Sequence, residues 1–327
     1  MPAAFVTGGT GFVGWHVAKT LLAEGWTERA LARGAPSRRS GLEDLSVEIV
    51  AGDLASAGDF GRALAGCDAV IHAAGLLKAR ALADYRAVNV SGTERILAAA
   101  SAACPDATFV YVSSQAAAGP ARDGRPVAEG DAAKPVSWYG ISKLEGEEAV
   151  ARNWKGRWVV VRPGVLYGPR DRGLLTYFRM AARGFVPVPA ASTRIQAGAI
   201  EETALGIVRA ASRRDLAGRI GFLCDPRPLT VREFASAIAA TANRPARLID
   251  IPDAAVRIAG AFESFRETLT GASRPFNADK AREILSGDWL CDPAPLRRDL
   301  GLPNPPPLEH GLRAAWNWYR ANAWIAS

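Results

Sequence analysis

A glycine-rich turn close to the N-terminus restricts the possible folds of this chain more than any other feature. It lies between an apolar run at 3–6 and a set of apolar positions at helical spacing, so the order strand, glycine turn, helix is predicted. Gly8 permits backbone angles that a side chain would forbid, Gly11 lets an anion approach the helix N-terminus, and Gly14 lets the helix pack closely on the strand. The turn is therefore predicted to hold a pyrophosphate, and the alternative is a tight turn without a ligand.

The composition is that of an ordinary globular protein. Of the 327 residues, 49% are hydrophobic and 22% are charged, which suits a folded chain with room for two lobes. The four cysteines are scattered without the spacing of metal ligands. They are expected to be packing residues in a reducing compartment, and no metal site is predicted.

Charge and hydropathy argue against two classes of partner. The net charge is +7, but the 40 Lys and Arg residues are spread out without interleaved aromatic residues, so no nucleic-acid partner is expected. No uncharged apolar stretch reaches the roughly 18 residues that a membrane span needs. Met1 leads directly into the first predicted strand without a signal peptide, so a cytoplasmic protein without membrane contact is expected.

Apolar runs alternate with helical patterns through the first half of the chain. Strands are predicted at 3–6, 28–32, 47–50, 69–72, 108–112 and 157–162. This alternation is typical of the α/β class with a Rossmann-type doubly wound parallel sheet. A helix is predicted from 82 to 102, in which Asn89 interrupts the apolar stripe and needs hydrogen-bond partners. His72 is expected to be a satisfied residue at a strand end rather than a catalyst.

Basic residues follow the second predicted strand. In the NAD-binding form of this unit, an acidic side chain about 20 residues beyond the glycines binds the ribose hydroxyls. Here that position holds Arg33, and Ser37, Arg38 and Arg39 come after it. A guanidinium can bind a 2′-phosphate through two hydrogen bonds, so NADP is the predicted cofactor. The alternative is NAD bound beside an exposed loop arginine.

The chain is expected to divide into a dinucleotide-binding domain at 1–168, to which 195–225 returns, and a smaller C-terminal substrate-binding lobe at 169–327. In this second part, helices are predicted at 174–183, 203–213, 232–241 and 308–322, and strands at 220–223 and 247–251. Thr230 and Glu233 have the spacing of a capping box at the start of the third helix.

Three polar side chains are candidates for the chemistry. Ser114 closes the fifth predicted strand, and Tyr139 and Lys143 are four residues apart on a predicted helix, so they share one face. Beside a nicotinamide, Tyr139 would protonate a carbonyl oxygen, Lys143 would lower the pKa of the phenol, and Ser114 would orient the oxygen. Each residue also has a purely structural interpretation: a tyrosine packed on the sheet, a solvated lysine and a serine that ends a strand.

With these motifs the chain resembles an extended short-chain dehydrogenase/reductase of the NAD(P)-dependent epimerase/dehydratase superfamily. The matching elements span about half of the chain: Thr7-Gly8-x-x-Gly11-x-x-Gly14, Asp53-Leu54, His72-Ala73-Ala74-Gly75, Asn89-Val90-x-Gly92-Thr93, Val112-Ser113-Ser114, Tyr139-x-x-x-Lys143 and Arg162-Pro163-Gly164-x-x-Tyr167-Gly168-Pro169. The resemblance implies Ser114, Tyr139 and Lys143 as the catalytic set. It implies a dinucleotide site formed by Thr7, Gly8, Thr10, Gly11, Phe12, Val13, Arg33, Arg38, Asp53, Leu54, Ala73, Ala74, Gly75, Val112, Tyr139, Lys143, Pro163 and Val165.

The resemblance also narrows the activity. Val165 stands where nucleotide-sugar epimerases carry an asparagine, and the stretch 114–120 is more similar to 3β-hydroxysteroid dehydrogenases and dihydroflavonol reductases. The first hypothesis is an NADP-dependent oxidoreductase that interconverts a carbonyl and a secondary alcohol on a partly apolar small molecule. The alternatives are a nucleotide-sugar 4-epimerase or dehydratase with tightly bound NAD, and a non-catalytic dinucleotide-sensing regulator. A homodimer is one assembly that the resemblance implies, and the predicted substrate contacts are Gln115, Trp138, Tyr167 and Gln196.

Overall fold

The computed structural model describes residues 1–33, 41–55, 60–190, 192–242, 245–274 and 276–325. Its largest element is a seven-stranded parallel sheet in the order β11-β6-β5-β4-β1-β2-β3. The strands are β1 (Ala3–Thr7), β2 (Thr27–Ala32), β3 (Glu48–Ala51), β4 (Ala69–His72), β5 (Thr108–Val112), β6 (Trp158–Pro163) and β11 (Arg219–Leu223). The strand order reverses between β1 and β4, which is where ligands bind in open α/β sheets.

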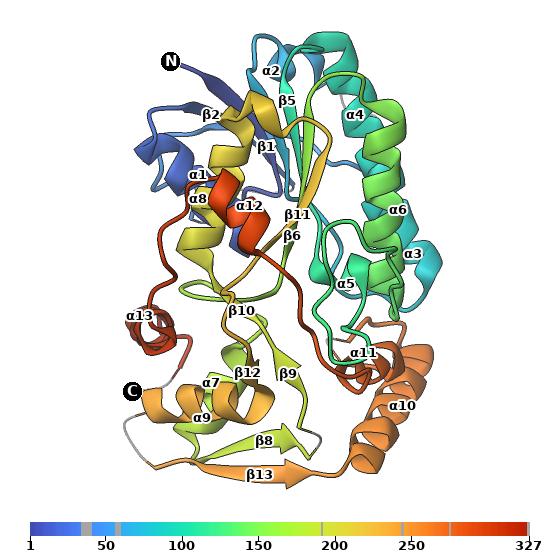
Figure 1. The fold of residues 1–327 in the computed structure, drawn as a ribbon, viewed down its shortest axis with the longest axis vertical. Coiled ribbons are helices and arrows are strands. Elements are labelled where there is room, and N and C mark those ends of the chain that lie inside the picture. Colours follow the sequence, from blue (N-terminus) through green and yellow to red (C-terminus); the bar gives the residue numbers. More distant parts are fainter. Residues whose placement is uncertain (34–40, 56–59, 191, 243–244, 275, 326–327) are drawn as a thin grey trace.

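Helices cover both faces of the sheet (Figure 1). One face packs against α1 (Phe12–Ala23), α8 (Ile200–Ser212) and α12 (Ala294–Asp299). The other packs against α2 (Gly61–Leu64), α4 (Ser91–Ala103) and α6 (Trp138–Asn153), with α3 (Leu82–Asn89) alongside α6. The predicted doubly wound α/β sheet is confirmed, and its interior strands are buried on both faces, as their continuous apolar runs require.

The helix predicted over 82–102 is instead two helices. The backbone bends at Val90, with φ −106° and ψ −64°, so that α3 ends at Asn89 and α4 begins at Ser91. The amide of Asn89 is fully buried at this break. The interruption that the sequence suggests in the apolar stripe thus coincides with a break between two helices.

A smaller lobe lies below the sheet in Figure 1 and has a hydrophobic core of its own. It contains α7 (Leu175–Ala182), β8 (Phe185–Pro189), α9 (Val231–Thr241), β13 (Arg247–Ile251) and α13 (Leu308–Ala321). Two short strand pairs, β7 (Val165–Tyr167) with β10 (Ala197–Ala199) and β9 (Arg194–Ile195) with β12 (Leu229–Thr230), connect it to the sheet. The predicted capping box is confirmed, because Thr230 and Glu233 bind each other's backbone N–H groups at the start of α9.

Three further helices flank the boundary between the two parts. The single turn α5 (Gln115–Ala118) follows β5, and α10 (Asp253–Thr270) packs on α11 (Ala278–Ile284) at the lower right of Figure 1. The amide N–H of Trp138, the first residue of α6, donates to the carboxylate of Asp279 at 3.0 Å. The α10–α11 pair is therefore attached directly to the start of α6.

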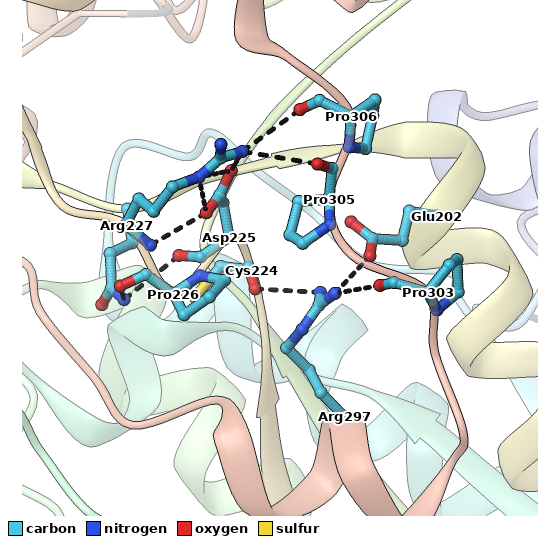
Figure 2. A network of polar contacts seen from close by, with 10 residues as sticks. Glu202, Cys224, Asp225, Pro226, Arg227, Arg297, Pro303, Pro305 and Pro306 are labelled. Atoms are coloured by element: carbon cyan, nitrogen blue, oxygen red, sulfur yellow. Dashed lines mark hydrogen bonds and ion pairs between the residues drawn. The ribbon is translucent and has the colours of Figure 1, made fainter.

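A buried ion pair holds the C-terminal segment against the boundary (Figure 2). The Arg297 guanidinium bonds Glu202 at 2.5 Å, and both side chains are over 90% buried. It also donates to the carbonyl oxygens of Cys224 and Pro303. Arg227 donates to carbonyl oxygens further along the same proline-rich segment. The ends of β11 and α12 and the first turn of α8 are thereby fixed to one another.

Candidate functional site

A cavity of about 410 Å³ lies at the carboxyl ends of the central strands. It brings together sixteen of the residues predicted from the sequence: Gly8, Thr10, Gly11, Phe12, Val13, Arg33, Asp53, Leu54, Ala73, Ala74, Gly75, Val112, Ser114, Tyr139, Lys143 and Pro163. Three further lining residues, Gly14, Ser113 and Gly164, belong to the motifs quoted above but were not predicted as site residues. The sequence analysis did not single out the others, which are Leu31, Leu76, Leu77, Val88, Leu166 and Asp171.

The glycine turn forms one end of the cavity. Gly8 has φ +75°, and a Cβ there would lie 2.7 Å from the backbone nitrogen of Ala74. A Cβ on Gly14 would lie 2.1 Å from the carbonyl oxygen of Gly8, so helix and strand meet without room for a side chain. Helix α1 begins after Gly11 with no side-chain cap and no acidic residue in its first turn. Its first N–H groups therefore point to an electropositive opening that suits a phosphate.

Thr7 and His72 support this turn from below. The Thr7 hydroxyl lies 2.6 Å from His72 Nδ1 and accepts from the Ala74 N–H at 3.2 Å. His72 Nε2 lies 2.9 Å from the Thr93 hydroxyl. Burial lowers the pKa of His72 to about 3, and the charge of Lys143 acts in the same direction. His72 is thus a neutral, satisfied strand-end residue, as the sequence analysis expects.

Asn89 fixes the loop that forms another wall. Its side-chain oxygen accepts from the Leu76 N–H at 2.6 Å, and its amide donates to the Leu76 carbonyl and to the Ser142 hydroxyl. A Cβ on Gly75 would lie 3.3 Å from the Asn89 oxygen and 3.9 Å from Lys143 Nζ. The partners expected for this buried amide are present, and they place residues 75 and 76 over the lysine.

Lys143 is a buried cation at the floor of the cavity. Its ammonium donates to the Val112 carbonyl at 2.8 Å and lies 4.1 Å from the centroid of the Tyr111 ring. Desolvation lowers the pKa of Lys143 to about 7, against an opposing effect of the Glu147 charge. The structural interpretation of a solvated lysine does not fit this position. At neutral pH the side chain is poised between its two protonation states.

Ser114 and Tyr139 meet across the cavity. Ser114 caps α5 by accepting from the Ala116 N–H at 3.1 Å, and its side chain lies near enough to Tyr139 to favour the phenolate form. Burial raises the pKa of Tyr139 above its ordinary value, and Ser114 offsets only part of that effect. Lys143 is not among the groups that shift this pKa, so its effect on the phenol stays a prediction. The phenol is therefore neutral near pH 7 and can donate a proton.

Ser113 has a different environment from its neighbour. Its hydroxyl donates to Glu147 at 2.5 Å, and Glu147 forms a buried ion pair with Arg162 at 2.6 Å. The Ser113 hydroxyl is therefore engaged below the cavity, whereas that of Ser114 faces Tyr139. This difference agrees with the choice of Ser114 as the residue that orients a substrate oxygen.

Six predicted site residues do not line the cavity. Tyr167 packs in the core of the smaller lobe, where its ring lies 6.1 Å from that of Phe234. Gln196 is buried. Its side-chain amide donates to the Asp225 and Pro226 carbonyls, and its side-chain oxygen accepts from the Cys291 N–H. The polar groups of Gln196 are thus bonded to the protein, and Tyr167 is 2% exposed. The other four are Thr7, which supports the turn, Val165 in β7, Gln115 in α5 and Trp138 at the start of α6.

The adenosine end of the cavity carries both an arginine and an acid. Arg33 is exposed at the end of β2, and Asp53 follows β3. Gly8 and Gly14, which have no Cβ, and the start of α1, which has no side-chain cap, fit the pyrophosphate of a dinucleotide. Arg38, the second arginine predicted to bind the cofactor, lies outside the described residues, as do Ser37 and Arg39.

Three findings concern only the described part of the chain. It contains no group of three His, Cys, Asp or Glu side chains placed to bind a metal ion. The Sγ atoms of Cys224 and Cys291 lie 3.4 Å apart in the core as free thiols, although they are far apart in the sequence. Among these residues, no helix combines the length and apolar character required to cross a bilayer.

Comparison with known proteins gives the same fold and a consistent chemistry. The model of the NAD dependent epimerase/dehydratase family matches residues 4–213. A ceramide reductase of Caulobacter vibrioides is 35% identical over 98% of this chain and 95% of that protein. The 4-hydroxy-2-methyl-3-oxo-4-farnesyl-3,4-dihydroquinoline-1-oxide ketoreductase of Stigmatella aurantiaca is 30% identical over 95% and 94% of the two chains. The UDP-glucuronic acid 4-epimerase of Bacillus cereus, solved with NAD, has the same fold with a TM-score of 0.75 at 18% identity, covering 97% and 98% of the two chains.

Proposed function

The chain belongs to the NAD dependent epimerase/dehydratase family, as an NAD(P)-dependent oxidoreductase of the extended short-chain type, and from this premise we propose that it is an NADP-dependent ketone reductase. Its substrate is a small molecule with a substantial apolar portion. The observation that carries the proposal is that Ser114, neutral Tyr139 and the buried Lys143 line one cavity behind the glycine turn.

The protonation state of Tyr139 favours reduction. Reduction of a ketone requires a proton for the oxygen as the carbon accepts hydride, and a protonated phenol is such a donor. Tyr139 gives its phenolic proton to the carbonyl oxygen, while the Ser114 hydroxyl holds that oxygen by a hydrogen bond. The Lys143 ammonium, fixed by the Val112 carbonyl, stabilises the phenolate that is left, which then regains a proton from solvent.

The dinucleotide, when bound, supplies hydride from its reduced nicotinamide. Gly8, Gly11 and the start of α1 would hold its pyrophosphate, because a Cβ at Gly8 would collide with the neighbouring backbone and α1 begins without a side-chain cap. Arg33 offers its guanidinium to the 2′-phosphate of NADP at the other end of the cavity. The finer assignment of NADP over NAD rests on this arginine.

The apolar character of the substrate is supported by the cavity wall on the catalytic side. Leu76, Leu77, Val88 and Leu166 are among the lining residues of the cavity, and 169–327 contributes Asp171 to the lining. The two relatives described above are named for a ceramide and for a farnesyl quinoline oxide, both of which carry long hydrocarbon chains. We therefore place the substrate of this chain among ketones on lipid-like molecules.

The proposal is tested by NADPH consumption with a panel of 3-oxo lipids and short soluble ketones, measured against NADH and against nucleotide sugars. The expected result is oxidation of NADPH by at least one ketone, and a loss of at least about a hundredfold in kcat for Tyr139→Phe. A protein that consumes no NADPH but epimerises a nucleotide sugar, and that releases NAD when denatured, would overturn it. Retention of full activity by Tyr139→Phe would do the same.

A further inference from the structure

Helix α10 has two sharply different faces. Its inward face packs on α11 so closely that a Cβ on Gly260 would lie 2.7 Å from the Ala281 side chain. Its outward face presents four large apolar side chains whose exposed fractions are 59–69%: Ile258, Phe262, Phe265 and Leu269. We call these four residues the α10 stripe. Most exposed large apolar side chains of the described structure belong to it.

The stripe follows from the spacing of its members. Separations of four, three and four residues return to nearly the same side of an α-helix, since each residue turns the chain by about 100°. The buried positions Val256, Gly260 and Glu267 lie on the opposite side. The stripe therefore cannot join the core of this fold, and it extends along roughly 16 Å of the helix.

Charge is distributed to match an anionic surface. All acidic residues of α10, namely Asp253, Glu263 and Glu267, are buried or half-buried. The exposed positions contain no acid, and they include Arg257 on one side of the stripe. On the other side Arg266 pairs with Glu263 at 2.9 Å, so the charge of that acid is neutralised within the helix. Phe and Leu beside Arg on one face of a helix is the pattern of helices that lie in a membrane interface.

The stripe also ends beside the loop that forms the cavity wall. Arg80 lies near the C-terminal end of α10, since a Cβ on Gly271 would be 3.8 Å from its guanidinium. The Asn277 amide, at the start of α11, donates to the Ala79 carbonyl. Leu77 in the same loop lines the cavity and is 74% exposed, and Lys78 and Arg80 are exposed as well. The apolar stripe, its basic neighbours and one edge of the cavity thus adjoin each other.

We propose that the outward face of α10 docks on the surface of an anionic phospholipid bilayer. The four apolar side chains enter the acyl boundary, while the exposed Arg257, Lys78 and Arg80 contact lipid phosphates. This places the cavity edge at Leu77 next to the lipid phase. The inference goes beyond the proposed function, and membrane binding does not require that function to be correct. It revises the sequence-based expectation of a protein without membrane contact.

Vesicle cosedimentation of the full chain tests this docking. The probes are vesicles of phosphatidylglycerol mixed with phosphatidylcholine, and vesicles of phosphatidylcholine alone. Binding is expected to be stronger by roughly tenfold or more on the anionic vesicles and to weaken with added salt. Phe262→Ser/Phe265→Ser should reduce binding by at least about tenfold. Both side chains are exposed, so unchanged circular dichroism and melting temperature are expected for this variant.

A matched charge control separates the docking face from general basicity. Arg257→Glu and Arg214→Glu change the net charge equally, but Arg214 is an exposed residue before β11, at the amino ends of the strands and away from the cavity. Only Arg257→Glu should weaken vesicle binding. The variant Phe262→Ser/Phe265→Ser should still oxidise NADPH with a short soluble ketone. If neither the wild type nor this variant reduces any ketone, the proposed function is wrong, but the vesicle-binding comparison between the two proteins still tests the docking proposal.

Three outcomes would overturn the docking proposal. The wild-type chain could remain in the supernatant with anionic vesicles. Binding could persist unchanged in Phe262→Ser/Phe265→Ser, which would show that another surface is responsible. Light scattering could reveal a wild-type dimer that becomes a monomer in this variant, in which case a second copy of the chain covers the stripe.

Discussion

The carboxylate of Glu147 forms a 2.6 Å ion pair with the guanidinium of Arg162, and both side chains are at most 4% exposed. The same carboxylate accepts a hydrogen bond from the Ser113 hydroxyl, and Glu147 lies one helical turn beyond Lys143 on α6. Its negative charge raises the pKa of Lys143 against the burial that lowers it to about 7. The ion pair thus joins β6 to α6 and also influences the protonation state of the candidate catalytic lysine.

Replacement of Glu147 by glutamine should change the pH dependence of reduction. The ammonium form of Lys143 is present below its pKa, so kcat/KM for ketone reduction should fall as the pH rises through about 7. Glu147→Gln removes the charge that supports the ammonium and should move this fall to lower pH. The measurement is a pH profile of kcat/KM, taken below the melting temperature of each variant.

Glu145→Gln is the matched control for this measurement. Glu145 lies on the same helix, and its partner Arg86 is at the surface with a side chain that is 51% exposed. The control should leave the profile unchanged. Identical profiles for wild type and Glu147→Gln would contradict the role given to Glu147.

Replacement of Lys143 by methionine should remove activity and increase stability at neutral pH. The ordinary pKa of a lysine, 10.5, is lowered to about 7 in the folded protein. The unfolded chain therefore binds more protons between pH 7 and 10.5, and the free energy of unfolding of the wild type rises with pH across that window. At one pKa unit per 1.36 kcal/mol, the cost of the charged lysine is at most about 5 kcal/mol.

The net gain for Lys143→Met should be smaller, roughly 2 kcal/mol at pH 7, because the hydrogen bond to the Val112 carbonyl and the contact with the Tyr111 ring are lost. Thermal melts between pH 6.5 and 10.5 would measure it, and the difference from wild type should shrink toward the alkaline end. A methionine variant that melts below the wild type at pH 7 would show that the buried ammonium is not a cost to the fold.

Local patterns were sufficient to predict the sheet and most of the cavity. The glycine turn requires particular backbone angles, and Tyr139 and Lys143 are one helical turn apart, so both features can be recognised within a few residues. The strand order then brings β1, β4 and β5 together at their carboxyl ends. Since parallel strands end at a common edge, residues that follow them could be assigned to one site.

Residues whose surroundings come from distant segments were not predictable in this way. Tyr167 and Gln196 look like exposed polar candidates in the sequence, but α9, α13 and the segment around Cys291 cover them in the fold. The pKa of Tyr139 depends on its burial and on Ser114, Glu283 and Tyr85 from other segments, which no spacing within α6 reveals. Helix α10 went unrecognised, although its apolar spacing was visible, because its apolar face does not belong to the core.

Replacement of Arg33 by aspartate should reverse the preference for the dinucleotide. An arginine at the end of β2 can pair with a 2′-phosphate, whereas an aspartate repels it and accepts hydrogen bonds from the ribose hydroxyls of NAD. The ratio of kcat/KM for NADPH to that for NADH should fall by about tenfold to a hundredfold, as expected for the loss of one charge-assisted pair. Arg29→Asp serves as the control, because Arg29 lies within β2, does not line the cavity, and binds the carbonyls of Ala63 and Ala65 and the carboxylate of Glu48. An unchanged ratio in Arg33→Asp would assign the preference to other residues.

Replacement of Arg297 by methionine should destabilise the junction between the sheet and the smaller lobe. The change leaves Glu202 buried without its cation and removes the donors to the Cys224 and Pro303 carbonyls (Figure 2). Breaking a buried pair on one side costs about 3–5 kcal/mol, so a clear fall in melting temperature is expected in calorimetry.

The double variant Arg297→Met/Glu202→Met distinguishes the unpaired charge from the lost attachment. With both charges replaced by apolar groups, the cost of the buried carboxylate disappears, and the double variant should melt above Arg297→Met. Only the missing bonds to the two carbonyls then remain as a deficit, at about 1 kcal/mol each. If the double variant is instead less stable than Arg297→Met, Glu202 contributes to the fold independently of the arginine, and the ion pair is not what fixes the end of α12 to the first turn of α8.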